Sequence, residues 1–302
     1  ALDSSLPQVK KQLAAFHDLR GGKALAMVFG DLERQGINPV FGFGSMQDLK
    51  DSSKVISGVQ SGGLGLPDRD YYVKNDEKTK QVRDLYSAHI AKMFELLGDK
   101  PDVANKKRDA IMAFETRLAK VTLTNVERRD PEKVYHRVEK AGLQKIAPSF
   151  DWDQFYSAMG APKDPALSVE HIPFFQEFDK IVKDTTPDTW EAYLSWVYLR
   201  SIVPALPKAF QDEAFAYSSK ALTGAKEDRP RWKKCVSFAD EQLGEALGRV
   251  FVDETFGADG KARTLAIVKA LEGSMADDLK AVPWMDAATK KTALEKTAKM
   301  YN

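Results

Sequence analysis

Apolar residues recur at intervals of three and four along most of this 302-residue chain, and this spacing limits the chain to a largely helical fold. One apolar face begins after Asp76, and Gly98 follows its last residues where a C-cap glycine is expected. A capping residue followed by proline predicts two further helix starts, at Asp130-Pro131 and at Thr186-Pro187, the first helix extending through Val138. The other predicted helices cover residues 9–19, 25–36, 111–121, 230–250, 261–279 and 286–302.

The periodicity changes in one short region near the amino terminus. The runs Pro39–Gly44 and Lys54–Val59 are rich in β-branched and aromatic residues, and the polar segment 48–53 lies between them. This pattern predicts a pair of strands joined by a long connection.

The fold class predicted from these patterns is mainly α, a multi-helix bundle with a small β-hairpin near the amino terminus. We expect one helical domain over residues 1–302, in which residues 1–66 form an α/β segment with the hairpin and residues 67–302 are all helical. The chain has no internal repeat of fixed period and no low-complexity tract that would indicate another architecture.

The composition excludes several classes of partner. The chain has 45 Lys and Arg against 44 Asp and Glu, so its formal charge of +1 favours neither nucleic acid nor an anionic lipid surface. Its longest apolar runs, such as Ala24–Phe29, are far shorter than the roughly 20 residues of a membrane-spanning helix. The chain begins at Ala1 without Met, as a processed protein or a piece of a longer one would.

Metallohydrolase chemistry on a helix needs two histidines one turn apart with a glutamate beside the first, and this sequence has no such H-E-x-x-H motif. The four histidines are spread along the chain: His17, His89, His136 and His171. Glu139 follows His136 and Glu170 precedes His171, but each pair supplies too few ligands for zinc. His89 lies on the apolar face after Asp76, which indicates a core position.

The sequence also has no complete motif for nucleophilic catalysis or for phosphate binding. A Gly-x-Ser-x-Gly elbow is absent, and the lone Cys235 excludes an intrachain disulfide and a Cys-rich zinc site. We expect the Cys235 thiol to be buried beside Trp232 and Val236 on a helix. The glycines at 62–65 lack the Lys-Ser/Thr of a nucleotide loop, so we interpret them as a tight turn. We therefore assign no catalytic, cofactor-binding or metal-binding residue in this chain.

Four strings, in order along the chain, resemble the neprilysin and endothelin-converting-enzyme family of zinc metallopeptidases. Leu64-Gly-Leu-Pro-Asp-Arg-Asp-Tyr-Tyr72 is similar to that family's Leu-Gly-Leu-Pro-x-Arg-Asp-Tyr-Tyr signature, and it is the most specific match. The others are Arg128-Arg-Asp-Pro131 with Tyr135, the Trp-x-x-Cys string in Arg231–Val236, and Trp284-Met-Asp-Ala-Ala-Thr-Lys-Lys291. The resemblance spans about residue 20 to Asn302.

The resemblance implies that the parent protein is a zinc-dependent metalloendopeptidase of small peptides. In that family the H-E-x-x-H helix and the third zinc ligand follow the Trp-Met-Asp region, so zinc is expected in the full-length enzyme and not in this chain. The chain is then the amino-terminal helical lid, inactive alone, which encloses the active-site cavity and limits substrate size. Its expected partners are the carboxyl-terminal catalytic domain of the same protein and peptide substrates.

The unpaired Cys235 resembles the bacterial branch of the family, whereas animal members are rich in disulfides. A secreted, periplasmic or cell-surface location is what the resemblance implies for the parent protein. A function of a different class stays open at this point: a stand-alone helical module that binds peptides or a partner protein without cleaving anything.

Overall fold

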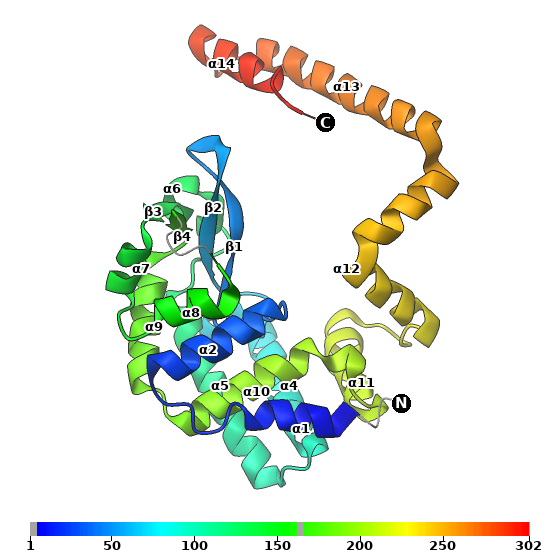
Figure 1. Cartoon of the computed structure of the whole chain (residues 1–302). Helices are drawn as coiled ribbons and strands as arrows, with labels where there is room; N and C mark the ends of the chain where they lie inside the picture. Colours follow the sequence, from blue (N-terminus) through cyan, green and yellow to red (C-terminus); the bar gives the residue numbers. More distant parts are fainter. Residues whose placement is uncertain (1–4, 162–165, 302) are drawn as a thin grey trace. The chain divides into compact units, whose positions relative to one another are not determined.

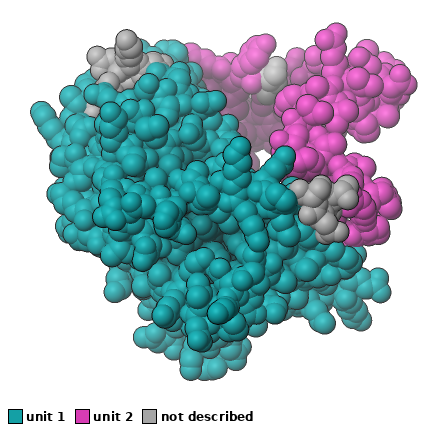
Figure 2. Space-filling model, turned by 60° about the horizontal axis from the view of Figure 1, so that its bottom comes forward, with its two compact units in different colours: residues 1–228 teal, residues 229–302 magenta. Residues whose placement is uncertain are grey.

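A computed structural model describes residues 5–161 and 166–301 of the chain. By their internal contacts, the residues form two compact units, residues 1–228 and residues 229–302, which Figure 2 shows in different colours. None of the helices in the described ranges is long and apolar enough to cross a membrane.

The helices and strands of unit 1 begin with two helices and a hairpin and continue as a helical array with two further short strands (Figure 1). In chain order they are α1 (Leu6–Ala14), α2 (Gly21–Arg34), β1 (Phe41–Asp48), β2 (Asp51–Ser61), α3 (Asp70–Val73), α4 (Glu77–Leu97), α5 (Pro101–Val121), η2 (Glu127–Arg129), α6 (Pro131–Val134), β3 (His136–Val138), α7 (Lys140–Ile146), α8 (Trp152–Met159), β4 (Leu167–Val169), α9 (Ile172–Asp184), α10 (Pro187–Ser201), η3 (Val203–Ala205), α11 (Lys208–Phe215) and the π-helix η4 (Ala216–Ala221).

Unit 2 consists of α12 (Arg231–Phe251), the π-helix η5 (Val252–Phe256), α13 (Gly257–Ala281) and α14 (Ala287–Thr297). The predicted mainly helical fold with a small hairpin near the amino terminus is thus confirmed.

Capping residues in the sequence predict several helix ends correctly. Gly98 caps α4 in the left-handed conformation with φ 108°, and the Thr186 hydroxyl caps α10 by accepting from the Thr189 N–H.

Helix α10 is the centre of unit 1, because it is buried on all sides. One group of its side chains joins a cluster that includes Phe29, Phe41 and Phe150, and Trp190 lies 5.8 Å from the Phe29 ring. Another group, including Trp196, joins a second cluster with side chains from α4 and α5. Helix α10 therefore contributes side chains to both clusters, as α5 also does.

The sheet has four strands in the order β1-β2-β4-β3. Strands β1 and β2 are antiparallel, with Phe43 opposite Val59, and β2 is parallel to β4. Strand β3 is antiparallel to β4, with His136 opposite Val169. The hairpin of β1 and β2 extends beyond the helices of unit 1 (Figure 1).

Two predictions about the region after residue 66 are wrong. Residues 67–302 are not all helical, because β3 and β4 lie in this range, and the helix that starts at Pro131 ends at Val134 instead of Val138. Each added strand has three residues, which is too short to show alternation in the sequence. Their pairing partners are distant in the chain, so no local pattern announces them. The hairpin connection is also shorter than predicted, since β1 reaches Asp48 and β2 begins at Asp51.

Helices α2 and α8 approach closely at a point where both carry small side chains. A Cβ atom added at Gly30 would lie 2.4 Å from the Ala158 Cβ and 3.3 Å from the Phe155 carbonyl oxygen. The absence of a side chain at Gly30 therefore sets the distance between the two helices and keeps Phe155 in the aromatic cluster.

We predict that Gly30→Ala lowers the free energy of unfolding by about 1–3 kcal/mol, because the added methyl group overpacks this crossing. Urea unfolding, monitored by tryptophan fluorescence, measures the effect. Adding Ala158→Gly should restore part of the loss, and the control Gly44→Ala, where the added Cβ meets open space, should change stability by less than about 1 kcal/mol. Equal effects at Gly30 and Gly44 would contradict the close approach.

Candidate functional site

The Leu-Gly-Leu-Pro loop is held by the tyrosine that ends the same motif. The N–H groups of Gly65 and Leu66 donate to the Tyr72 hydroxyl oxygen at 3.1 and 2.9 Å. These two N–H groups are therefore already paired within the protein. The Tyr72 hydroxyl in turn donates to Oε2 of Glu115 at 2.7 Å.

Glu115 is a fully buried carboxylate at the centre of this polar network. Its Oε1 accepts from the Tyr86 hydroxyl at 3.0 Å and lies 3.9 Å from Nη1 of Arg200. The Trp196 indole donates to the Tyr86 oxygen at 2.7 Å. Burial raises the pKa of Glu115, while the Arg200 charge and the hydrogen bonds from Tyr72 and Tyr86 lower it. The network joins the loop to α3, α4, α5 and α10.

The loop passes so close to these tyrosines that two glycines are required. A Cβ at Gly65 would lie 1.7 Å from the Tyr86 hydroxyl oxygen, and Gly63 has φ +83°, which side-chain-bearing residues rarely adopt. The Tyr193 hydroxyl donates toward the carbonyl oxygens of Gly63 at 2.7 Å and Pro39 at 2.5 Å. Gly65 of the motif and Gly63 just before it thus serve packing and backbone geometry.

The motif that begins with Arg-Asp-Pro and ends with Tyr135 forms a second contact with the hairpin, at the turn between β1 and β2. The Asp48 side chain is buried and accepts from the Tyr135 hydroxyl at 2.6 Å, from Nη1 of Arg137 at 2.7 Å and from the Lys50 N–H at 2.9 Å. The hydrogen bond from Tyr135 is the largest of the influences that lower the pKa of Asp48. Tyr135 therefore fastens the hairpin to the segment that carries β3.

Two of the four histidines pair with glutamates. His89 is buried, its Nδ1 lies 2.9 Å from Oε1 of Glu213, and its ring stacks on Tyr217 at 4.6 Å. Burial lowers the pKa of His89, and Glu213 partly offsets this. The predicted core position of His89 is confirmed. His17 lies on the surface, with Nδ1 2.7 Å from Oε2 of Glu191, whose hydrogen bond raises the His17 pKa.

The fold brings the other two histidines near each other, which spacing along the sequence did not reveal. Burial lowers the pKa of His171, Glu170 raises it, and the nearby His136 lowers it further. However, Nδ1 of His136 lies 3.0 Å from the Val169 carbonyl oxygen, and Glu170 accepts hydrogen bonds from the Ser61 N–H and hydroxyl. Over residues 5–161 and 166–301, no three His, Cys, Asp or Glu side chains are grouped so that they could hold a metal ion. These residues do not fit a zinc site.

The prediction that Cys235 is buried is wrong, because the thiol is exposed on α12. None of the described residues of α12, η5, α13 and α14 is buried. Helical periodicity placed Cys235 correctly beside an apolar stripe, but burial requires a second element to cover that stripe, and unit 2 supplies none.

Unit 2 therefore presents a large apolar surface. Trp232 is 65% exposed and Trp284 is 75% exposed, values that soluble proteins seldom leave to tryptophan without a partner. The exposed large apolar side chains of unit 2 are Trp232, Val236, Phe238, Leu243, Leu247, Val250, Phe251, Val252, Phe256, Ile267, Leu271, Met275, Trp284, Met300 and Tyr301. We call this set the unit 2 apolar surface.

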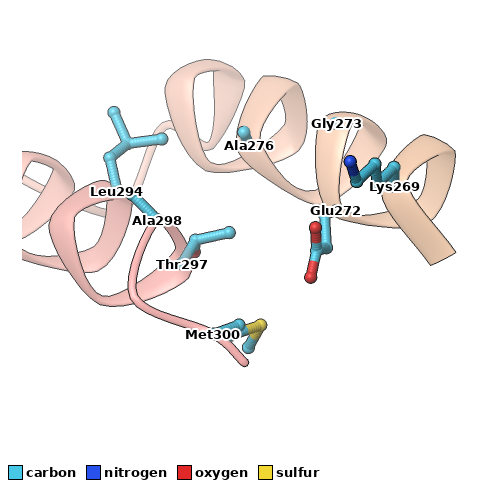
Figure 3. A pocket seen from close by; sticks show the side chains of 8 residues that line it. All are labelled: Lys269, Glu272, Gly273, Ala276, Leu294, Thr297, Ala298 and Met300. Carbon is cyan, nitrogen blue, oxygen red and sulfur yellow. The ribbon is translucent and has the colours of Figure 1, made fainter. Parts of the chain in front are cut away.

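A groove of about 410 Å³ lies between α13 and α14 (Figure 3). Leu294, Thr297 and Met300 line it on the side of α14, and Lys269 and Glu272 on the side of α13. It combines small and apolar side chains with one charged residue of each sign. This composition fits helix packing better than catalysis, because the groove has no nucleophile paired with a base.

Taken together, the motifs hold loops and strands in place, and unit 1 is a packed helical scaffold. The chain belongs to Peptidase family M13, whose amino-terminal sequence profile matches residues 3–302. The family resemblance stated from the four motifs is thereby confirmed.

Two curated relatives illustrate the match. The chain is 32% identical to human endothelin-converting enzyme 1 over 270 residues, which cover 88% of this chain and 35% of that protein. It is 30% identical to neprilysin-3 of Drosophila melanogaster over 274 residues, covering 87% of this chain and 35% of that protein. The chain thus spans about a third of the length of these relatives.

Solved structures agree. The chain is similar to the crystal structure of zinc metalloprotease ZMP1 of Mycobacterium tuberculosis in complex with an inhibitor, with 30% identity and a TM-score of 0.89, covering 97% of this chain and 44% of that one. PepO from Lactobacillus rhamnosis shares the fold at 19% identity, with a TM-score of 0.80 over 100% of this chain and 47% of that one.

We predict that Glu115→Gln lowers the free energy of unfolding by about 3 kcal/mol, because the amide cannot accept from both tyrosines and leaves Arg200 without a charged partner. Chemical unfolding of the full chain measures the loss. The matched control is Glu132→Gln at an exposed position, where the change should stay within about 0.5 kcal/mol. Similar values for both variants would show that the network does not stabilise the fold.

Proposed function

We propose that this chain is the non-catalytic amino-terminal region of a zinc metalloendopeptidase that hydrolyses oligopeptides. In this proposal it encloses the active-site cavity of the parent enzyme and limits the size of the substrates that enter. The observation that carries the proposal is the M13 profile, which matches almost the whole chain, while the chain spans less than half of the solved zinc metalloprotease ZMP1.

The unit 2 apolar surface supports the proposal that this chain packs against another domain of the same polypeptide. Burying one large apolar side chain contributes about 1.5–3 kcal/mol, so a surface with this many exposed members has a strong driving force to pack against another body. The proposed partner is the catalytic domain in the part of the parent protein that the relatives have beyond this match. Zinc would be held there, since the described residues of this chain do not fit a zinc site.

The packing of unit 1 supports the role of a wall. Its aromatic clusters meet at α10, and the Glu115 network ties the loop after β2 to the helices behind it. Such close-packed interiors deform little, so a cavity bounded by them keeps its dimensions and can exclude larger polypeptides. Enclosure also removes bulk water from the reacting groups.

We further propose that the parent protein is secreted, periplasmic or exposed on the cell surface, which rests on its family resemblance alone. Fractionation of cells that produce the full-length protein tests this location.

The 302-residue chain alone is expected to bind no stoichiometric zinc and to hydrolyse no peptide. The full-length parent protein is expected to bind zinc and to hydrolyse peptides. Atomic absorption and a quenched fluorescent peptide measure zinc and cleavage on both proteins. Turnover with bound zinc in the 302-residue chain would refute the non-catalytic assignment. Peptide binding by a parent protein that neither holds zinc nor cleaves would favour a stand-alone binding module instead.

Leu243→Gln and Leu247→Gln test the proposed use of the unit 2 apolar surface. In the isolated chain each should change the free energy of unfolding by no more than about 0.5 kcal/mol, because both side chains are exposed, at 59% and 47%. In the parent protein each should cost about 1–3 kcal/mol, since a buried leucine loses its apolar contacts. Differential scanning calorimetry compares the two proteins.

The control for this pair is Glu241→Gln, an exposed position on the same helix, which should be neutral in both proteins. If the leucine variants are as neutral as this control in the parent protein, the surface does not contact the catalytic domain.

A further inference from the structure

A second groove, of about 580 Å³, lies within unit 1 between α1, the carboxyl end of α4, α5 and α10. Its volume falls in the range of small-molecule sites, roughly 300–1,000 Å³. Leu13, Phe94 and Leu97 give it apolar walls, and Phe94 is almost fully buried beneath it. No motif of the family resemblance lies in this groove, and the proposed function does not use it.

Most of the charges around the groove are already paired. Nδ1 of His17 lies 2.7 Å from Oε2 of Glu191, and Nζ of Lys107 lies 2.7 Å from Oδ2 of Asp99. Each pair is formally neutral when His17 is protonated. Lys10 also lines the groove, and among the described residues it has no ion-pair or hydrogen-bond partner for its ammonium group. The groove therefore has one uncompensated positive charge.

Ser195 adds an unpaired hydroxyl to the same groove. The residue is only 5% exposed, yet its hydroxyl has no hydrogen-bond partner within the described parts of the chain. Ser201 in the same helix shows the usual alternative, because its hydroxyl donates to the Val197 carbonyl oxygen at 2.8 Å. The Ser195 oxygen is not one of the buried unpaired side-chain atoms, so it reaches the solvent-filled space of the groove and is available to a ligand there.

We propose that this groove binds a small monocarboxylate that carries an apolar side chain, such as an N-blocked amino acid or the carboxyl-terminal residue of a short peptide. The carboxylate accepts from the Lys10 ammonium group and the Ser195 hydroxyl, and the side chain lies against the half-buried Leu13 and Leu97. A doubly charged phosphate fits less well, because the groove has only one uncompensated positive charge to balance it.

The test is a titration of the isotope-labelled 302-residue chain with N-acetyl-L-leucine, in which NMR chemical shifts report binding. Saturable shifts at groove residues, with a Kd on the order of 1 mM, are expected for a ligand of this size. N-acetyl-L-leucinamide, which lacks the charge, should bind about tenfold more weakly. Glycyl-L-leucine distinguishes a peptide terminus from a blocked amino acid, and binding of either supports the site. Absence of saturable shifts for both carboxylates, or equal binding of the amide, would overturn the proposal.

Variants locate the binding. Lys10→Gln should weaken N-acetyl-L-leucine binding about tenfold, and the neighbouring exposed Lys11→Gln, which lies outside the groove lining, should leave it unchanged. Ser195→Ala should weaken binding about threefold to tenfold without lowering the melting temperature, because the hydroxyl has no partner to lose. Equal effects of Lys10→Gln and Lys11→Gln would show non-specific attraction and refute the site.

Discussion

The buried carboxylate of Glu115 is the interaction on which the organisation of unit 1 depends. A charge in an apolar interior is costly unless it is paired and hydrogen-bonded, and here two tyrosine hydroxyls and Arg200 supply those partners. Because Tyr72 also accepts from the loop N–H groups, satisfying the carboxylate fixes the backbone of the loop. The most specific sequence motif of the chain is thus explained by the requirements of a buried charge.

The same network connects the two hydrophobic clusters. Tyr86 and Trp196 belong to the cluster that includes the buried face of α4, whereas Tyr193, one turn earlier on α10, contacts Phe114 in the other cluster. Polar and apolar contacts alternate along one helix, so neither cluster can rearrange without disturbing the other. This coupling supports the proposal that unit 1 acts as a wall that limits substrate size.

The sequence predicts well what is decided locally. Gly98 and Thr186 mark helix ends correctly because their backbone or side-chain geometry acts within one turn. Strands β3 and β4 escape prediction, because each depends on a partner that lies far along the chain. Glu115 carries no signal of its own: it lies within a helix, and only the fold shows that two tyrosines and an arginine surround it. The prediction for Cys235 fails for a related reason, because a helical stripe is buried only where another element covers it, and no described residue of α12 is buried.

The division at residue 228 has a practical meaning for anyone who shortens this protein. Every side chain of the two hydrophobic clusters lies before that point, while the family profile continues to residue 302. The segment that the family shares, residues 3–302, is therefore longer than the segment that packs around the two clusters, residues 1–228. Helices α12, α13 and α14 are inherited with unit 1, but their apolar side chains are not covered by one another.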